Sequence, residues 1–152
     1  MKAVVQRVKE AKVEVENKNV GNISNGLVVL IGITQTDNSQ IIDWFVNKII
    51  NLRVFSDNDG KLNLSVKDIN GEILLVPNFT IYGDAKKGYR PSYVMAAKSE
   101  ISESIFNEFY DKLNQAMPKK IQKGIFGADM QVSLVNDGPV TLVIEKEISE
   151  KE

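Results

Sequence analysis

The chain has 152 residues and a formal net charge of −1, with 43% hydrophobic and 26% charged residues. These are ordinary globular values, and they exclude a disordered or collagen-like chain. The sequence contains no cysteine and no histidine, which excludes disulfides, Ser-His-Asp and Cys-His catalytic groups, and zinc held by either residue. Because a domain typically has about 100–200 residues, we expect one domain over residues 1–152.

The sequence also bears on location and partners. Gln6, Arg7 and Glu10 interrupt the first apolar run, so it does not match a signal peptide. The longest apolar stretch, residues 27–33, is far shorter than a membrane span. We therefore expect a cytoplasmic protein without a membrane segment. Because the net charge is near zero, a nucleic-acid partner can be argued only from a local basic patch.

Strands are predicted for the first part of the chain. Residues 2–8 and 11–16 are predicted to form two strands, and in the second Val13 and Val15 alternate with polar residues. The polar residues 17–19 are typical of a turn into the next strand. Residues 26–33 form a continuous apolar run rich in Val and Ile, which predicts a strand covered on both faces.

Two amphipathic helices are predicted. Asp37-Asn38-Ser39 offers an N-cap, and apolar residues spaced three and four apart then predict a helix over residues 39–52. A second helix is predicted over residues 99–117, with Pro118 ending it. Its apolar stripe is predicted to consist of Ile101, Ile105, Phe109 and Leu113.

The remaining segments predict further strands. Asn70-Gly71 is a hairpin signal, and residues 72–82 are predicted to form the strand after it. At the end of the chain, residues 130–134 and 140–144 are predicted to pair across a turn at 136–139. The order of elements predicts an α/β fold: a single domain of mixed or antiparallel β layers (β/β/α), with two main helices on one side.

Three segments are candidates for a site. Lys86, Lys87 and Arg90 form a basic cluster, which is either a solvated loop or a track for phosphates. Thr80 ends a predicted strand before a glycine-containing loop, and it is either an ordinary strand residue or part of a site. The turn at 136–141 is either a plain hairpin connection or a functional feature.

A metal site is not predicted. Residues 56–60 look like the opening of a calcium loop, but placing Gly60 at the loop's glycine puts Phe55 at the first ligand position. The sequence predicts a polar turn there, and we expect neither a metal nor a cofactor.

The chain from Met1 to about Glu145 resembles the D-aminoacyl-tRNA deacylase family, formerly called D-tyrosyl-tRNA deacylases. The similarity is carried by many segments in the family's order. They include residues 3–8, 26–27, 52–55, 60–66, 87–92, 124–130 and 136–141. The resemblance implies a homodimer that hydrolyses the ester between a D-amino acid and tRNA, without a cofactor. Glycyl-tRNA is an additional expected substrate.

The resemblance also implies the site residues. The family's two signature motifs map onto residues 77–81 and 136–141, and they face each other across the dimer interface. Phe79 and Thr80 are implied for catalysis, and the basic cluster for tRNA binding. Implied for substrate binding and chiral selection are Pro77, Asn78, Gly138, Pro139 and Arg7. In the family the bond matching Gly138-Pro139 is cis, and the residue matching Arg7 holds that turn.

The first motif departs from the family's pattern. Pro77, Asn78 and Ile81 stand where Ser, Gln and Leu are usual, and a relaxed animal relative also carries Pro at the first place. Tyr89 stands where Arg is common, which removes one charge from the tRNA-facing loop. Two alternatives therefore remain open: a deacylase of relaxed chirality, and a dimer that binds tRNA without cleaving it.

A mechanism without histidine is expected for such an ester. The backbone amides of Phe79 and Thr80 are candidates to stabilise the oxyanion. The 2′-hydroxyl of the terminal ribose is the candidate base, and Thr80 as a nucleophile is the competing mechanism. If carbonyls at Gly138-Pro139 hold the substrate's amino group, an L side chain would clash with the turn.

Overall fold

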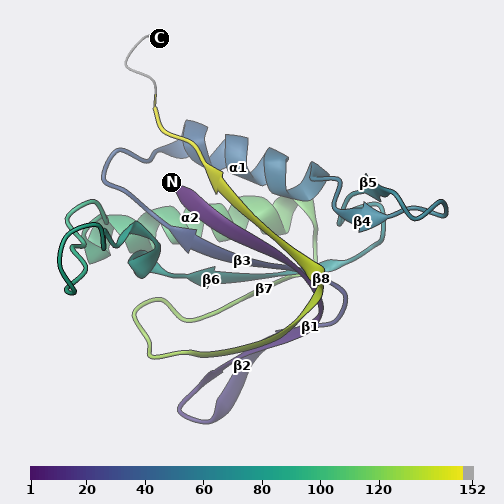
Figure 1. Cartoon of the computed structure of the whole chain (residues 1–152), viewed down its shortest axis with the longest axis horizontal. Coiled ribbons are helices and arrows are strands. Elements are labelled where there is room, and N and C mark those ends of the chain that lie inside the picture. Colours follow the sequence, from purple (N-terminus) through teal and green to yellow (C-terminus); the bar gives the residue numbers. More distant parts are fainter. Residues whose placement is uncertain (149–152) are drawn as a thin grey trace.

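The computed structural model describes residues 1–148 and contains one six-stranded mixed sheet (Figure 1). The strand order is β2-β1-β3-β6-β7, and β8 pairs with β1 as well. The β3–β6 and β6–β7 pairs are parallel and the others antiparallel. The elements are β1 (Lys2–Val15), β2 (Lys18–Ile23), β3 (Gly26–Gly32), α1 (Ser39–Asn51), β4 (Phe55–Ser56), β5 (Leu62–Leu64), β6 (Glu72–Pro77), the 3-10 helix η1 (Phe79–Tyr82), α2 (Ser99–Ala116), β7 (Ile121–Lys123) and β8 (Gln131–Glu145).

Two apolar clusters hold the sheet on its two faces. The larger cluster lies between the sheet and both helices, where Phe45 of α1 contacts Phe109 of α2 with ring centroids 6.4 Å apart. The smaller cluster lies on the other face, among residues of β1, β2, β3 and β6 with Met130 and Leu134 packed against it. β3 is buried on both faces, as predicted. The predicted fold class, with two main helices on one side of a mixed sheet, is confirmed.

The prediction of two strands over residues 2–8 and 11–16 was wrong, because β1 is one strand of 14 residues. Its first half pairs with β3, its second half pairs with β2, and β8 runs along both halves. Register shifts near Val8 interrupt the apolar alternation there. A strand that changes partners along its length therefore looks like two strands in the sequence.

The predicted hairpin at the end of the chain was also wrong. Residues 131–145 form the single strand β8, which pairs antiparallel with β1 on both sides of an irregular segment. Asn136-Asp137-Gly138-Pro139 lies within this strand as an irregularity, at the register shifts in β1. The Asn136 side chain accepts a hydrogen bond from the Val140 amide. The strand therefore continues through a sequence that is typical of a turn that reverses the chain direction.

Two further expectations were corrected around β6. Asn70 has a positive φ of 54° and forms a turn, but β6 then pairs in parallel with β3, so the turn closes no hairpin. A hairpin is found instead in the segment before this turn, where β4 pairs antiparallel with β5. The predicted strand 72–82 ends at Pro77, and η1 follows it.

The two helices match their predicted ranges to within one residue. The Asn38 side chain caps α1 by accepting from the Ile41 amide. The predicted stripe of α2 is partly wrong, because Ile101 is 43% exposed. The buried residues of α2 are Ser102, Phe106, Phe109 and Leu113, and the Ser102 hydroxyl donates to the Ala97 carbonyl, which satisfies it in the buried face. Among residues 1–148, no helix is both long and apolar enough to cross a membrane.

Candidate active site

The first motif lies at the carboxyl end of β6. The amide of Asn78 donates to the carbonyl of Ile31 at 2.8 Å, which is the last ladder bond before η1 begins. The Thr80 hydroxyl then donates to the Asn78 side-chain oxygen at 2.6 Å. Pro77, Asn78, Phe79 and Thr80 are thus brought together at the start of a short helix, where the sequence predicted a plain strand end.

The amides of Phe79 and Thr80 are available as hydrogen-bond donors. The first amide of η1 with a helical partner is that of Ile81, which donates to the Asn78 carbonyl at 3.3 Å. Within residues 1–148, neither preceding amide has an acceptor. The first N–H groups of a helix characteristically lack intrahelical partners. Two neighbouring donors at an exposed turn can hold an oxyanion without any charged side chain.

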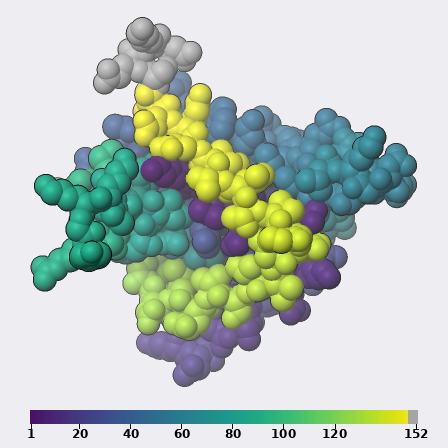
Figure 2. Space-filling model, in the orientation of Figure 1, coloured from purple at the N-terminus to yellow at the C-terminus, as the bar shows by residue number. Residues whose placement is uncertain are grey.

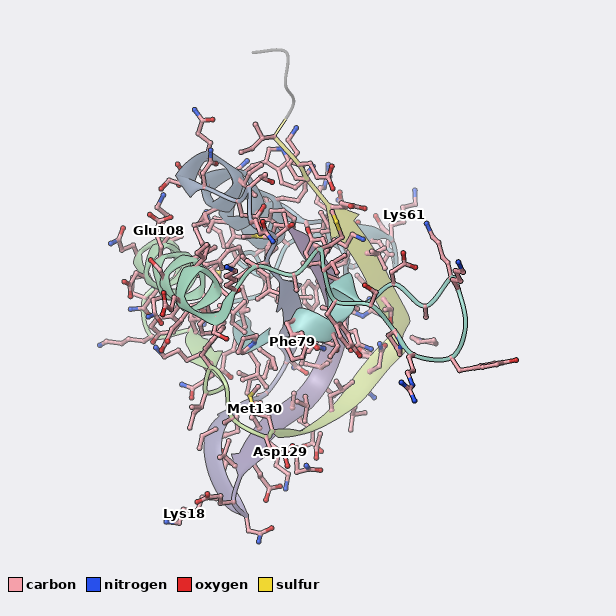
Figure 3. The ribbon with its side chains drawn as sticks, turned by 90° about the vertical axis from the view of Figure 1, so that its left-hand side faces the viewer. Lys18, Lys61, Phe79, Glu108, Asp129 and Met130 are labelled. Carbon is pink, nitrogen blue, oxygen red and sulfur yellow. The ribbon has the colours of Figure 1, made fainter. Side chains whose placement is uncertain are left out.

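A cavity of about 1070 Å³ adjoins these amides. Its wall includes Phe79 and Thr80, the start of α2, and the segment from Phe126 to Leu134. Figure 3 shows Phe79, Asp129 and Met130 on the same side of the molecule. Most of the lining is apolar, and Lys98 and Asp129 are its charged side chains. The cavity therefore suits a largely uncharged group that enters beside the two amides.

The predicted basic cluster lies on the loop that follows η1. Figure 1 shows this loop projecting from the edge of the molecule. Asp84 and Ser92 close it with a pair of backbone hydrogen bonds of 2.7 and 2.8 Å, and Gly88 turns its tip with a φ of 68°. Lys86, Lys87 and Arg90 are all exposed on the loop. The loop with the three cations therefore directly follows η1, whose first residues line the cavity.

The second motif is held by Arg7. The guanidinium donates from Nε to the carbonyl of Asp137 at 2.8 Å and from Nη1 to the carbonyl of Val54 at 2.8 Å. Its side chain is 12% exposed, and Nε lies 3.8 Å from the carboxylate of Asp137. The Gly138-Pro139 peptide bond is cis. Arg7 therefore fixes the residue that immediately precedes Gly138.

Within one chain the two motifs lie apart. Pro77 is in register with Ile31 of β3, and Ile31 is opposite Ala3 of β1. Asn136 is instead opposite Val8 of β1. Five residues along β1 separate the two positions, which is about 16 Å at roughly 3.3 Å per residue. The structure of one chain does not bring Gly138-Pro139 to Phe79 and Thr80.

The sequence placed Asn136 in the second motif without assigning it a role, and it gave no sign of Val54. The Asn136 amide group donates to the Val140 carbonyl and to the Thr141 hydroxyl, while its oxygen accepts from the Val140 amide. The available signal was an Asn that precedes a Gly-Pro pair, since Asn side chains bond to nearby backbone. Val54 contributes through its carbonyl alone, and a backbone group leaves no sequence signal.

The residues described contain no group of three or more Asp, Glu, His and Cys side chains arranged to hold a metal ion. Carboxylates near the site occur singly, as Asp129 does in the cavity wall. The donor set around the two amides therefore consists of backbone N–H groups, one hydroxyl and one side-chain amide.

Comparisons with known proteins agree over nearly the whole chain. A family model described as D-Tyr-tRNA(Tyr) deacylase matches residues 4–145. The D-aminoacyl-tRNA deacylase of Thermosipho africanus is 54% identical over 145 residues, which cover 95% of this chain and 97% of that protein. The D-aminoacyl-tRNA deacylase of Flavobacterium psychrophilum is 51% identical over 150 residues, covering 99% of this chain and all of that protein.

Two solved structures are similar. A protein described as c-Myc DNA Unwinding Element Binding Protein superposes with a TM-score of 0.92 at 42% identity, over 97% of this chain and 100% of that one. A probable eukaryotic D-amino acid tRNA deacylase superposes with a TM-score of 0.81 at 16% identity, over 94% of this chain and 97% of that one. The second similarity concerns the fold alone.

Proposed function

The chain belongs to the D-Tyr-tRNA(Tyr) deacylase family, and on that premise we propose that it is a D-aminoacyl-tRNA deacylase. It hydrolyses the ester between a D-amino acid and the 3′ end of tRNA, and releases both for reuse. This activity removes mischarged tRNA before translation uses it. Glycyl-tRNA is a further proposed substrate, since glycine has no side chain to be rejected. The proposed domain spans residues 1–152.

The observation that carries the mechanism is the pair of unpartnered amides at Phe79 and Thr80 beside the cavity. When water attacks the ester carbon, the carbonyl oxygen becomes an oxyanion that accepts from both amides. Each such donor is worth about 3–4 kcal/mol in other enzymes. The ribose 2′-hydroxyl accepts a proton from the attacking water and passes its own proton to the 3′-oxygen, because this chain has no histidine to do so. The bond between the ester carbon and the 3′-oxygen then breaks, and the products are the free D-amino acid and a tRNA with both ribose hydroxyls restored.

Chiral selection is assigned to a second copy of the chain. Its Gly138-Pro139 turn reaches the cavity beside Pro77 and Asn78, and its carbonyls hold the substrate's α-amino group. In that position the side chain of an L-amino acid collides with the turn, whereas that of a D-amino acid points away. The 16 Å separation of the two motifs within one chain supports a site shared between subunits, at about 3.3 Å per residue.

The homodimer is supported by the exposed surface of β8. Among the described residues this strand pairs with β1 alone. Figure 2 shows it running uncovered across the face of the molecule. Val135 is 45% exposed and Val143 is 72% exposed on it. An apolar strand surface of this kind is typical of an interface between protein chains.

The tRNA is proposed to contact the loop that carries Lys86, Lys87 and Arg90. Exposed cations on one projecting loop can pair with phosphates, and such contacts give affinity that falls as salt rises. The proposed location is the cytoplasm, where aminoacylated tRNA is made and used.

A deacylation assay with matched D- and L-tyrosyl-tRNA tests the proposal. We expect rapid release of D-tyrosine and little release of L-tyrosine. Comparable rates on both substrates would instead indicate the relaxed-chirality deacylase. Binding of tRNA without cleavage of either ester would indicate the non-catalytic dimer.

A further inference from the structure

Tyr93 directly follows the basic loop in the sequence and contacts η1 through its ring. Its ring lies edge-on to the ring of Phe79, with centroids 5.3 Å apart and planes at 68°. Edge-to-face is a preferred geometry for aromatic pairs, and such pairs contribute more stability than the burial of their surface alone would give. Tyr93 also lines the cavity beside the two amides. It therefore lies next to the reaction site without belonging to either signature motif.

The same ring covers the other end of η1 at Gly83. A Cβ placed on Gly83 would lie 2.9 Å from Cε1 of Tyr93 and 2.9 Å from the carbonyl oxygen of Thr80. Real Cβ atoms do not approach neighbours so closely, so only glycine lets the ring pack this tightly. The Gly83 amide donates to that Thr80 carbonyl at 2.9 Å. One aromatic ring thus contacts both the first residue of η1 and the residue that ends it.

The backbone of Tyr93 is firmly anchored. The preceding residue, Ser92, makes the two backbone bonds to Asp84 that close the basic loop. The Tyr93 carbonyl accepts from the Ala96 amide at 3.1 Å, and the next carbonyl but one, that of Met95, accepts from the Thr34 hydroxyl at 2.6 Å. The backbone that carries the ring is therefore held against Thr34, which follows β3, and the ring, although 41% exposed, contacts Phe79 of η1.

We propose that Tyr93 is a positioning residue for hydrolysis, whose ring holds η1 so that the amides of Phe79 and Thr80 keep their direction toward the cavity. This inference rests on the proposed role of those amides. Tyr93 acts through the contacts of its ring, and its hydroxyl takes no part. The ring's effect therefore falls on the rate of the chemical step and leaves tRNA affinity nearly unchanged.

The test compares kcat and KM for D-tyrosyl-tRNA in variants at position 93. We expect Tyr93→Ala to lower kcat roughly 30-fold, because a misplacement of about 1 Å can cost about 100-fold. Its KM should change less than about threefold, since the proposed effect of the ring is on the direction of the two amides and not on the bound substrate. Tyr93→Phe should restore kcat. Val94→Ala is the matched control, because this neighbour is 75% exposed and does not line the cavity.

A shorter substrate separates the ring from the tRNA-binding loop. On 3′-O-(D-tyrosyl)adenosine, which lacks the tRNA body, the loss in Tyr93→Ala should persist. A variant with Lys86, Lys87 and Arg90 all changed to Ala should lose affinity for tRNA and behave like wild type on the short substrate. Gly83→Ala tests the contact from the other side, since Gly83 has an ordinary φ of −64°. It should lower kcat as Tyr93→Ala does.

The outcomes separate this inference from the proposed function. An unchanged kcat in Tyr93→Ala, a rise in KM alone, or an equal loss in Tyr93→Phe would each overturn it while the deacylase activity stands. A wild-type protein that cleaves no D-aminoacyl-tRNA would overturn both. If Tyr93→Ala fails to fold, as circular dichroism would show, the kcat of Tyr93→Leu decides, since Gly83→Ala also brings its Cβ against the Thr80 carbonyl.

Discussion

The hydroxyl of Thr80 donates a 2.6 Å hydrogen bond to the side-chain oxygen of Asn78. An amide oxygen accepts a hydrogen bond but does not remove a proton, so this contact orients the hydroxyl without activating it. With no histidine in the chain, no imidazole can act instead. The geometry favours a positioning role for Thr80 over covalent catalysis.

Thr80→Ala is therefore expected to keep a sizeable share of the deacylation rate, within about tenfold of wild type. Loss of a true covalent nucleophile costs about a million-fold in a serine protease. Single-turnover assays on D-tyrosyl-tRNA measure this, with the exposed Thr36→Ala as control. An acyl group trapped on Thr80 and identified by mass spectrometry would contradict the assignment.

The ribose 2′-hydroxyl is expected to supply the missing base. A D-aminoacyl-tRNA that ends in 2′-deoxyadenosine should be cleaved at least about 100-fold more slowly, the usual lower bound for losing a general base. Its dissociation constant should stay close to that of the normal tRNA, which filter binding can measure. Equal cleavage rates on the two tRNAs would require a base from the protein.

Arg7→Ala is expected to weaken chiral selection more than catalysis. Removing the guanidinium leaves the carbonyls of Asp137 and Val54 without their donor, so the turn before Gly138 loosens. We expect the preference for D- over L-tyrosyl-tRNA to fall at least about tenfold, or about 1.4 kcal/mol. The rate on glycyl-tRNA should change much less. Arg53→Ala is the control, because Arg53 is exposed and, among residues 1–148, its side chain hydrogen-bonds only to Asn63. An unchanged preference would show that Arg7 does not govern the turn.

Tyr82→Phe is expected to stabilise the protein. The Tyr82 hydroxyl is buried, and among residues 1–148 it has no hydrogen-bond partner. An unsatisfied buried polar group costs about 1–3 kcal/mol, so its removal should raise the free energy of unfolding by about 1 kcal/mol at neutral pH. Urea unfolding measures this, with the fully exposed Tyr89→Phe as control. A fall in stability would indicate that the hydroxyl has a bonding partner in solution.

Tyr82 should also make the wild-type protein sensitive to alkali. Burial, followed by the charges of Asp37 and Glu145, raises the pKa of Tyr82 above its ordinary value of 10.0. Above pH 10 the unfolded chain loses this proton while the folded chain keeps it, so stability falls as the pH rises. The unfolding free energy of Tyr82→Phe should fall less steeply over the same range. Parallel curves for the two proteins would contradict this.

Hydrolysis is expected to proceed without a metal ion. The chain lacks the histidine and cysteine that most catalytic zinc sites use. Deacylation by wild-type protein should therefore survive prolonged treatment with a chelator. Loss of the rate, with recovery on addition of one divalent metal, would show that a metal takes part.

How much of the fold could be predicted depended on how far apart in the sequence the interacting residues lie. The helix predicted over residues 39–52 and the buried strand predicted over 26–33 follow from local spacing, and both were found to within one residue. The hairpin at 136–139 was wrong because the side chain of Asn136 replaces a lost backbone partner, so turn chemistry fits within a strand. The choice of pairing partner for β8 depends on β1, which lies more than a hundred residues away.

The candidate site, like the fold, could be predicted only in part from the sequence. The segment at Phe79 and Thr80 was located from its motif, but η1 itself was not foreseen. The strand ends at Pro77, and the Asn78 amide makes the last hydrogen bond to β3, at the Ile31 carbonyl, so η1 begins at the next residue. The distance between the two motifs follows from strand register, which no local pattern contains.

The pairing of β8 with β1 has a consequence for how the protein is made. The contact of Arg7 with Asp137 spans 130 residues, so at about 5–20 residues per second the ribosome needs roughly 6–26 s to deliver the second partner. During that interval β1 presents one open edge to other nascent chains, which favours misassembly. The turn proposed to select the substrate is thus among the last parts to form, and faster translation should improve the yield of native protein.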